Sequence, residues 1–444
     1  MDEFFFLFLF IFFLIFWSFL LKRSGVKIST ISIPSLIIIA IFVYQYFGFP
    51  ILFFFLDDYR AFYVQDRYTI WQMFLWTSLT ITLIIIGFIF ARSKFGTLHL
   101  HNQYSSFSDN ISPTSAFQTF MLLILFIISI SVMVLYLSKV GWGNIAFLSA
   151  VGLTESDLEK VQLRSYMNNA FEGKHHRYSL FMRDFLSIVS VAFFGQWLVK
   201  KNYFTLTMFI LSLIICVFSM VMSIEKGPII WYLFSLFLIY TIIRYQGRYK
   251  LKHLAIISFF GFFLVGFMYI YFMNIEDFWT GITFGISRLF TGQMESLYHY
   301  LTIFPEEVEF LGGRSFPNPG GFFSYKPVSV TILVHSIIYP EMLVKGVVGS
   351  SPTFFWGEMY ANFGYLGIII PPFFVGYLLY WSNILIFRLP MTPIFLSFFI
   401  WIIMHYRTLS GVSLSEFIID TDMFVVVFLI ILFNANELKK KLRS

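Results

Sequence analysis

Residues 285–303, GISRLFTGQMESLYHYLTI, carry ionisable side chains at helical spacing in an otherwise apolar segment. Steps of four, three and four residues separate Arg288, Gly292, Glu295 and His299. A helix would place this polar stripe on one face, toward a wet cavity or another protein surface. Arginine can bind a phosphate through two parallel hydrogen bonds, and a carboxylate can orient or deprotonate a hydroxyl. The alternative is that Glu295 pairs with Arg288 or His299 and only holds the helix in place.

The following segment, 304–351, is rich in proline and glycine and also contains Arg314, Lys326 and His335. This composition predicts irregular structure rather than a regular helix or a membrane span. A long irregular segment in a compact protein is usually either disordered or functional. Because the segment also contains many aromatic residues, we expect it to be ordered and functional.

The dipeptide 351–352, Ser-Pro, has the signature of a helix start, in which a capping hydroxyl precedes a proline in the first turn. The predicted helix places Glu358 and Asn362 on one face, four residues apart, and kinks at the two prolines 371–372. From 352 to 387 it is too long for one bilayer crossing, so its first turns should project from the membrane and offer free amides to an anion. Glu358 then either orients a substrate hydroxyl or braces the helix.

Composition indicates which fold must position these residues. The chain of 444 residues is 58% hydrophobic and 22% aromatic, and short charged segments separate its long apolar runs. Runs of about 18–22 apolar residues match the thickness of a bilayer core. The sequence therefore predicts an all-α, polytopic integral membrane protein that forms a single membrane domain over 1–444. The eleven predicted spans are 4–21, 33–56, 69–90, 117–138, 181–199, 203–222, 229–243, 254–273, 361–387, 392–405 and 423–435.

The charges that flank the spans predict the orientation, because lysine and arginine accumulate on the cytoplasmic side. Asp2 and Glu3 precede the first span and Lys22 and Arg23 follow it, which is the reverse of a cleavable signal peptide. With the N-terminus outside, the cytoplasmic segments hold sixteen of the 30 basic residues and only two of the 24 acidic residues. We therefore expect the N-terminus outside and the C-terminus inside.

Two long outer segments, 139–180 and 274–360, carry arginines against the general preference for basic residues inside. The outer arginines are Arg164 and Arg177 in the first segment, Arg183 at the membrane re-entry that follows it, and Arg288 and Arg314 in the second segment. One explanation is pairing with the many outer acidic residues. The other is convergence on a phosphorylated ligand, whose oxygens the planar guanidinium binds in a bidentate manner. A lipid pyrophosphate fits, since its headgroup lies at that depth and its tail needs a groove among the spans.

Several functional classes find no support in the sequence. It contains no phosphate-binding P-loop, dinucleotide fingerprint, zinc-protease motif, EF-hand or serine-hydrolase elbow, so we expect no cofactor. Cys216 lies in a predicted span, and the adjacent His175 and His176 are a poor pair of ligands for one metal, so no metal site is predicted. The net charge of +6 is accounted for by the cytoplasmic anchors, which favours the lipid bilayer as a partner and no nucleic acid.

The stretch RLFTGQMESLYHYLTIFPEEVEFLGGRSFPNPGG, residues 288–321, followed by GSSPTFFWGEMYANFGYLG, residues 349–367, resembles the Wzy-type O-antigen polymerases of bacteria. The resemblance covers about 288–376, roughly a fifth of the chain. It implies a multi-pass glycosyltransferase of the inner membrane, with a periplasmic N-terminus and a cytoplasmic C-terminus. Such an enzyme transfers a growing glycan from undecaprenyl pyrophosphate to a newly flipped lipid-linked repeat unit, without a nucleotide sugar or an obligatory metal. The implied partners are undecaprenyl-pyrophosphate-linked glycans, a chain-length regulator and a flippase.

The resemblance also implies that outer arginines hold the pyrophosphates. The candidates are Arg288 and Arg314, followed by Arg164, Arg177 and Arg183. The reaction further requires an oriented acceptor hydroxyl. The candidates for this catalytic role are Glu358, His335 and Glu295. The alternative functions are O-antigen ligase and lipid-linked oligosaccharide flippase or transporter, although a transporter should have charges within several spans and broken helices in both halves.

Overall fold

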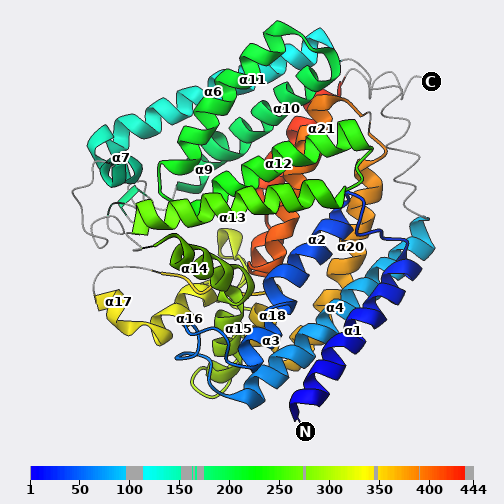
Figure 1. Cartoon of the computed structure of the whole chain (residues 1–444), viewed down its shortest axis with the longest axis vertical. Coiled ribbons are helices and arrows are strands. Elements are labelled where there is room, and N and C mark those ends of the chain that lie inside the picture. Colours follow the sequence, from blue (N-terminus) through cyan, green and yellow to red (C-terminus); the bar gives the residue numbers. More distant parts are fainter. Residues whose placement is uncertain are drawn as a thin grey trace. The chain divides into compact units, whose positions relative to one another are not determined.

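The computed structural model describes residues 2–96, 114–151, 163, 166–167, 175–273, 277–344, 349–389 and 391–435. Throughout these residues the regular elements are helices (Figure 1). Ten helical stretches of the described residues are long and apolar enough to cross a bilayer, so the chain is an all-α polytopic membrane protein, as predicted. The ten are Glu3–Ser24, Ile33–Phe53, Arg67–Phe95, Ala116–Val140, Arg177–Lys200, Tyr203–Val221, Lys226–Tyr245, Lys252–Tyr271, Tyr365–Ile386 and Pro393–Ser410.

These ten stretches coincide with the first ten predicted spans. The eleventh predicted span, 423–435, coincides with α22, Thr421–Phe433, which is apolar but has only 13 residues. At about 1.5 Å per residue α22 is about 20 Å long, whereas the hydrocarbon core of a bilayer is about 30 Å thick. The described part of α22 is therefore shorter than a full crossing.

The chain forms two compact units, each assembled from segments that are distant in sequence. The first unit comprises 1–99, 286–386 and 405–420, and the second comprises 100–285, 387–404 and 421–444. The helices of the first unit are α1 Asp2–Ser24, α2 Ile33–Ile41, η1 Phe42–Tyr46, α3 Phe49–Phe53, α4 Arg67–Phe95, α15 Gly292–Ile303, η4 Pro319–Gly321, α16 Val330–Ile338, α17 Pro340–Val344, α18 Phe355–Phe363, α19 Tyr365–Ile369, α20 Pro371–Ile386, η5 Thr408–Ser410 and η6 Leu414–Phe417. The helices of the second unit are α6 Ala116–Val140, η2 Trp142–Asn144, α7 Ala146–Val151, α9 His175–Ser179, η3 Leu180–Phe185, α10 Leu186–Lys200, α11 Tyr203–Val221, α12 Lys226–Tyr245, α13 Leu251–Met273 and α22, with most of α21 Pro393–Arg407. The helix α14, Phe278–Phe290, leads from the second unit into the first.

In the first unit, α4 packs closely against α20. A Cβ atom added to Gly87 would lie 2.3 Å from the carbonyl oxygen of Phe373, and one added to Gly376 would lie 2.1 Å from the carbonyl oxygen of Ile84. Because lipid tails are as apolar as most side chains, membrane helices associate through such close packing, which small residues permit. These two glycines therefore set the distance between α4 and α20.

The start of α4 is fixed by Asp66, whose carboxylate accepts hydrogen bonds from the backbone N–H groups of Tyr68 and Thr69. The Thr69 hydroxyl also donates to Asp66, and this hydrogen bond lowers the pKa of the Asp66 carboxyl. A negative charge at a helix N-terminus is favourable because the helix dipole is positive there. This cap ends the irregular segment 54–66, which leads from α3 into α4.

The predicted single helix over 285–303 is wrong, because α14 ends at Phe290 and α15 begins at Gly292. Between them, the Thr291 hydroxyl makes hydrogen bonds to the Asp57 carboxylate and to the Ser287 carbonyl oxygen. Glycine at the next position also weakens helix continuation. As a consequence, Arg288 lies on α14, whereas Glu295 lies on α15.

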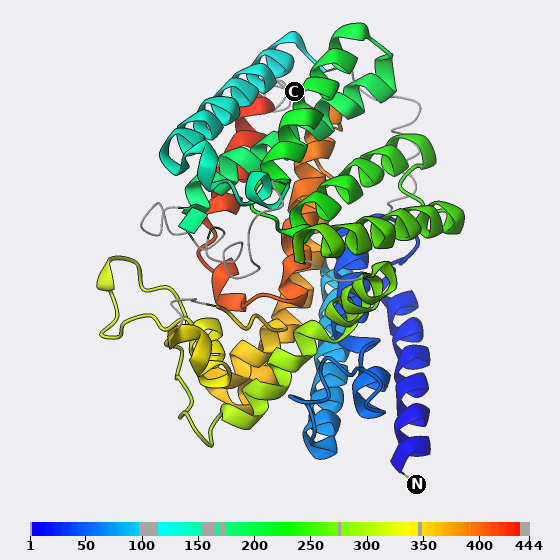
Figure 2. The same ribbon diagram turned by 60° about the vertical axis from the view of Figure 1, so that its left-hand side comes forward.

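The predicted helix start at 351–352 is also wrong, since α18 begins at Phe355. The Ser351 N–H instead donates to the Thr331 carbonyl oxygen, 3.0 Å away, which ties the Ser-Pro dipeptide to α16. Farther along, Gly364 has a φ of 60° and separates α18 from α19, and α20 begins at Pro371, where the kink was predicted. The segment 304–351, predicted to be irregular throughout, contains the short helices α16 and α17, as Figure 2 shows in yellow.

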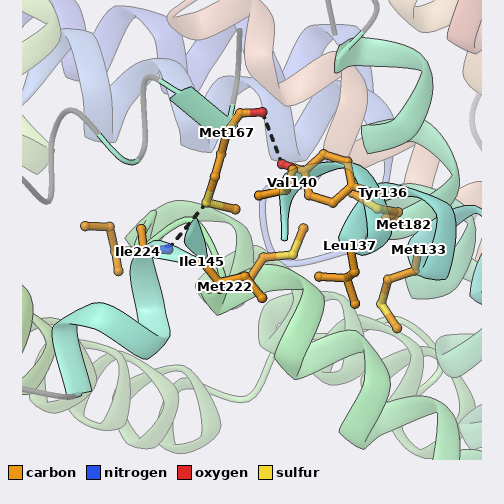
Figure 3. Packing of buried hydrophobic residues seen from close by; sticks show 10 residues of the cluster. Met133, Tyr136, Leu137, Val140, Ile145, Met167, Met182, Met222 and Ile224 are labelled. Carbon is orange, nitrogen blue, oxygen red and sulfur yellow. Dashed lines mark hydrogen bonds between the residues drawn. The ribbon is translucent and has the colours of Figure 1, made fainter. Parts of the chain in front are cut away.

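The second unit has a methionine-rich core between its helices (Figure 3). The Tyr136 hydroxyl donates to the Met167 carbonyl oxygen at 3.2 Å, and the Ala146 N–H points to the Met167 sulfur at 3.5 Å. Flexible thioether side chains fill irregular gaps, and here they join α6, α7 and η3. Other core members include Met133, Leu137, Val140, Ile145, Met182, Met222 and Ile224.

Candidate functional site

Glu295 is the centre of a buried polar cluster in the first unit. Its side chain is 6% exposed and forms an ion pair with Arg60, whose side chain is 12% exposed. The Tyr339 hydroxyl donates to the other carboxylate oxygen of Glu295 at 2.5 Å. Both oxygens of Glu295 are therefore occupied by strong donors, and the carboxylate joins three segments of the chain, 54–66, α15 and α17 with its preceding turn.

Asp57 anchors the segment that carries Arg60. Asp57 is 7% exposed, and its carboxylate accepts hydrogen bonds from the hydroxyls of Ser287, at 2.8 Å, and Thr291. Asp57 also begins the turn in which Arg60 donates its N–H to the Asp57 carbonyl oxygen. Arg60 is thus held from two sides, by its own ion pair and by the anchored turn beneath it.

Two arginine side chains approach the same backbone position, Gly292, Arg288 through its methylene carbons and Arg60 through its guanidinium. A Cβ atom at Gly292 would lie 3.0 Å from Cδ of Arg288 and 3.6 Å from Nη2 of Arg60. Arg288 is exposed, whereas Nε of Arg60 is buried and makes no hydrogen bond within the described residues. Glu295 pairs with Arg60, and of these two arginines Arg288 is the one that lies at the surface. This arrangement is suited to an anion that meets Arg288 at the surface.

Two histidines lie near this cluster. The ring of His335 on α16 is 5.0 Å from the ring of Tyr339, and burial lowers the pKa of His335, an effect that Glu341 partly opposes. His299 on α15 has a buried Nε2 atom without a hydrogen-bond partner in the described residues, and burial lowers its pKa as well. Both imidazoles are therefore predominantly neutral near pH 7, the state in which a histidine can accept a proton.

Glu358 occupies a different place, fully buried between two loops. Its carboxylate accepts a hydrogen bond from the Ser315 hydroxyl at 2.7 Å and one from the Ser415 N–H at 3.0 Å. Asn362, one turn later, donates to the Ser315 hydroxyl at 2.8 Å and accepts from the Gly313 N–H at 3.1 Å. This geometry favours the bracing role for Glu358, because neither carboxylate oxygen is open to a substrate.

Burial raises the pKa of Glu358, although the hydrogen bonds from Ser415 and Ser315 partly oppose the shift. The surrounding protein and the carboxylate of Glu358 also raise the pKa of Glu416 in η6. Glu416 reaches solvent, so water screens part of this effect. Both shifts favour the protonated form of these carboxyl groups.

Of the other predicted arginines, Arg314 belongs to the first unit, whereas Arg177 and Arg183 belong to the second. Arg314 is exposed in the loop 311–315, and its Nε donates to the Leu311 carbonyl oxygen at 3.0 Å. Arg183 belongs to the second unit, where it forms a 2.8 Å ion pair with Glu225 and a 2.6 Å hydrogen bond with Ser223. Arg177 is exposed in the second unit, and Arg164 lies outside the described residues.

Sequence reasoning missed Arg60, Asp57 and Tyr339. The first two lie in the segment LDDYR between the second and third predicted spans, where an outer arginine beside acidic residues was a detectable signal. Tyr339 carried no signal, because its role depends on a contact with a residue 44 positions away. A second ionisable pair was also missed, His405 with Asp420, whose side chains lie 2.5 Å apart at the end of the span Pro393–Ser410.

Within the described residues, no group of three or more His, Cys, Asp or Glu side chains is arranged to hold a metal ion. No protein-family model, no curated protein and no solved structure matches this chain. Function is therefore inferred from the site itself.

Proposed function

We propose that the protein is a membrane glycosyltransferase that polymerises undecaprenyl-pyrophosphate-linked oligosaccharide repeat units into O-antigen or a similar surface polysaccharide. The observation that carries this proposal is the approach of Arg288 and Arg60 to Gly292, beside the buried carboxylate of Glu295. An arginine of this kind can stabilise a leaving pyrophosphate as its negative charge develops. The spans Ile33–Phe53 and Arg67–Phe95, between which Arg60 lies, supply a membrane setting for the lipid tail.

Contacts within the first unit support a periplasmic position for this site. The starts of α1 and α4 lie together, since Glu3 and Arg67 form an ion pair at 3.5 Å, and this end of the helices carries the segment with Arg60. At the opposite ends, the Arg92 guanidinium donates to the Arg23 carbonyl oxygen, among the basic residues that end both helices. Because basic residues accumulate at the cytoplasmic face, this arrangement supports the proposal that the site faces the periplasm from the bacterial inner membrane.

In the proposed reaction, the acceptor hydroxyl oxygen bonds to the anomeric carbon of the donor glycan. The bond from that carbon to the pyrophosphate oxygen breaks, undecaprenyl pyrophosphate leaves, and the hydroxyl proton passes to a base. His335 is the best-supported base, since it is partly exposed, predominantly neutral and next to Tyr339. Glu295 positions Arg60, and Glu358 braces the surrounding loops.

A transporter for the lipid-linked unit is the second candidate, and the His405–Asp420 pair favours it. An ionisable pair at the end of a membrane span can take part in proton movement. The ligase alternative shares the donor and the chemistry of the polymerase and differs in the acceptor.

Replacement of Arg288 tests the polymerase directly in cells. We expect Arg288→Ala and Arg288→Lys, at normal protein levels, to restrict the surface glycans to one repeat unit, because a lysine ammonium cannot reproduce the bidentate guanidinium. Arg248→Ala, an exposed arginine of the second unit, serves as the matched control and should leave full-length polymer. Full-length polymer from the Arg288→Ala cells would place Arg288 among the purely structural residues.

A further inference from the structure

A cavity of about 720 Å³ lies in the first unit, outside the ten membrane-spanning stretches. Aromatic side chains of the segment 316–325 form most of one wall, and the backbone of Gly312 and Gly313 continues it. Ile418 and Ile419, which follow η6, form the other wall. This volume is within the range of about 300–1,000 Å³ that is typical of small-ligand sites.

The aromatic wall is fixed in place before any ligand arrives. The Asn318 side chain donates to the carbonyl oxygens of Phe323, at 2.8 Å, and Tyr325, at 2.7 Å, and accepts from the Phe323 N–H at 2.9 Å. The rings of Phe323 and Tyr325 are nearly parallel, with an interplanar angle of 14° and a centroid distance of 5.7 Å. The ring of Phe322 meets Phe323 edge-on at 5.2 Å. The loop therefore presents flat aromatic faces in a defined arrangement.

The buried residues of α18 fasten both walls of this cavity. Glu358 accepts hydrogen bonds from Ser315, next to the aromatic wall, and from Ser415, next to the isoleucine wall. Asn362 accepts from the N–H of Gly313, which lines the cavity itself. A fully buried carboxylate that holds two loops apart at a fixed distance is a costly feature. Its placement here indicates that the spacing of the two walls matters.

The chemistry of the walls and rim identifies the class of occupant. Phe322 is 85% exposed and Phe323 is 54% exposed, so a ligand could cover a large apolar area there. Arg314 and Lys326 are exposed and adjacent in the chain to lining residues, and no acidic residue occurs from 310 to 328. The occupant should thus combine flat apolar faces with negative charge nearby. A sugar ring has apolar C–H faces, and in the proposed substrate it is attached to pyrophosphate.

We infer that this cavity, lined by Phe316, Phe322, Phe323, Tyr325, Ile418 and Ile419, is a saccharide-binding site for the repeat unit of the lipid-linked substrate. This inference deepens the proposed function and depends on it. Sugar rings stack on the aromatic wall, and Arg314 and Lys326 attract the charged end of the same molecule. Glu358 and Asn362 are positioning residues, since they hold the walls without touching the saccharide.

Binding of free oligosaccharide to the purified full-length protein in detergent tests the inference. The probe is the oligosaccharide released by mild acid from the lipid-linked pool of the producing cells, and saturation-transfer NMR reports its affinity. We expect Phe322→Ala and Phe323→Ala to weaken binding at least tenfold, while Phe323→Tyr retains it. The control is Tyr203→Ala, which removes a ring that is 86% exposed elsewhere in the chain. Phe322→Ala keeps the test valid if Phe323→Ala does not fold, because such an exposed ring contributes little to the folded core.

Unchanged oligosaccharide affinity in both alanine variants would overturn the inference. If the alanine variants lose binding to vesicles of phosphatidylethanolamine and phosphatidylglycerol but keep their affinity for the oligosaccharide, the inference is also overturned, and the rings contact the membrane instead.

Elongation of lipid-linked units is measured on the same preparations. If the wild-type protein elongates the lipid-linked units and the alanine variants bind oligosaccharide normally, the cavity proposal alone is wrong. If the wild-type protein binds oligosaccharide through these rings but does not elongate the lipid-linked units, the polymerase proposal is wrong and the saccharide site remains supported.

Discussion

At the scale of single residues, the two carboxylates of the site have opposite partners. Glu295 is paired with a cation, Arg60, and with the Tyr339 hydroxyl. Glu358 forms no ion pair with the described residues and accepts hydrogen bonds from the neutral donors Ser315 and Ser415. Since burial penalises a charge that has no opposite partner, burial raises the pKa of Glu358 and favours its carboxylic acid form.

Removal of either member of the buried ion pair should be strongly destabilising. Glu295→Ala leaves Arg60 buried without its partner, and we expect a loss of about 3–5 kcal/mol in the free energy of unfolding. In the double variant Arg60→Ala with Glu295→Ala, the loss should be smaller than the sum of the two single losses, because no charge is left unpaired. Chemical denaturation of the four proteins in detergent measures this coupling. Strictly additive losses would mean that the two side chains do not interact.

Glu358 should make stability depend on pH. Its pKa is raised in the folded protein, so between the unfolded and folded pKa values the folded state holds a proton that the unfolded state has released. The contribution of the protonated Glu358 to stability is therefore full below about pH 4.5, the ordinary pKa of a glutamate. It is lost as the pH rises through the folded pKa. Glu358→Gln keeps both contacts, since an amide can donate to Ser315 and accept from Ser415, and it removes the titration. Melting temperatures should therefore fall with rising pH more steeply in the wild type than in Glu358→Gln. Parallel profiles for the two proteins would show that Glu358 does not titrate in this range.

At the scale of helices, close packing of α4 and α20 holds the frame that carries the site. Arg60 precedes α4, and Glu358 lies on α18, from which the chain continues through α19 into α20. A change in the distance between α4 and α20 would therefore move both parts of the site. The close contacts of Gly87 and Gly376 between α4 and α20 therefore affect the geometry of the site.

Gly376→Ala should lower stability by about 1–3 kcal/mol, because the added methyl group would meet the Ile84 carbonyl oxygen at 2.1 Å and force the helices apart. Gly87→Ala should act in the same direction through Phe373. Gly261→Ala is the matched control in another span, since no atom lies within 4 Å of the added methyl group. Thermal unfolding in detergent measures all three, and equal melting temperatures for Gly376→Ala and Gly261→Ala would contradict the packing argument.

The sequence predicted the elements that follow from local pattern and missed those that depend on distant contacts. The apolar runs located ten spans, and the helical spacing around Glu295 identified the central carboxylate. Arg60 was missed because its partner is 235 residues away. The break at Thr291 and the late start of α18 have the same cause, since Asp57 and Thr331 accept the hydrogen bonds that alter the local structure.

At the scale of the whole molecule, ten helical stretches within the described residues are long and apolar enough to cross a bilayer. Burial of ionisable groups is costly, so the Arg60–Glu295 ion pair and the fully buried Glu358 are the strongest general indication of function. We propose that the residues around them elongate a lipid-linked glycan.

Reconstitution of the purified protein tests this claim most directly. Wild-type protein and Arg288→Ala are placed in proteoliposomes with undecaprenyl-pyrophosphate-linked repeat units and no nucleotide sugar, and mass spectrometry reads the length of the lipid-linked products. We expect a series of products that differ by whole repeat units for the wild type and only the starting unit for Arg288→Ala. Products that stay at one repeat unit with the wild-type protein, even when the units cross the bilayer, would contradict the polymerase and favour the transporter.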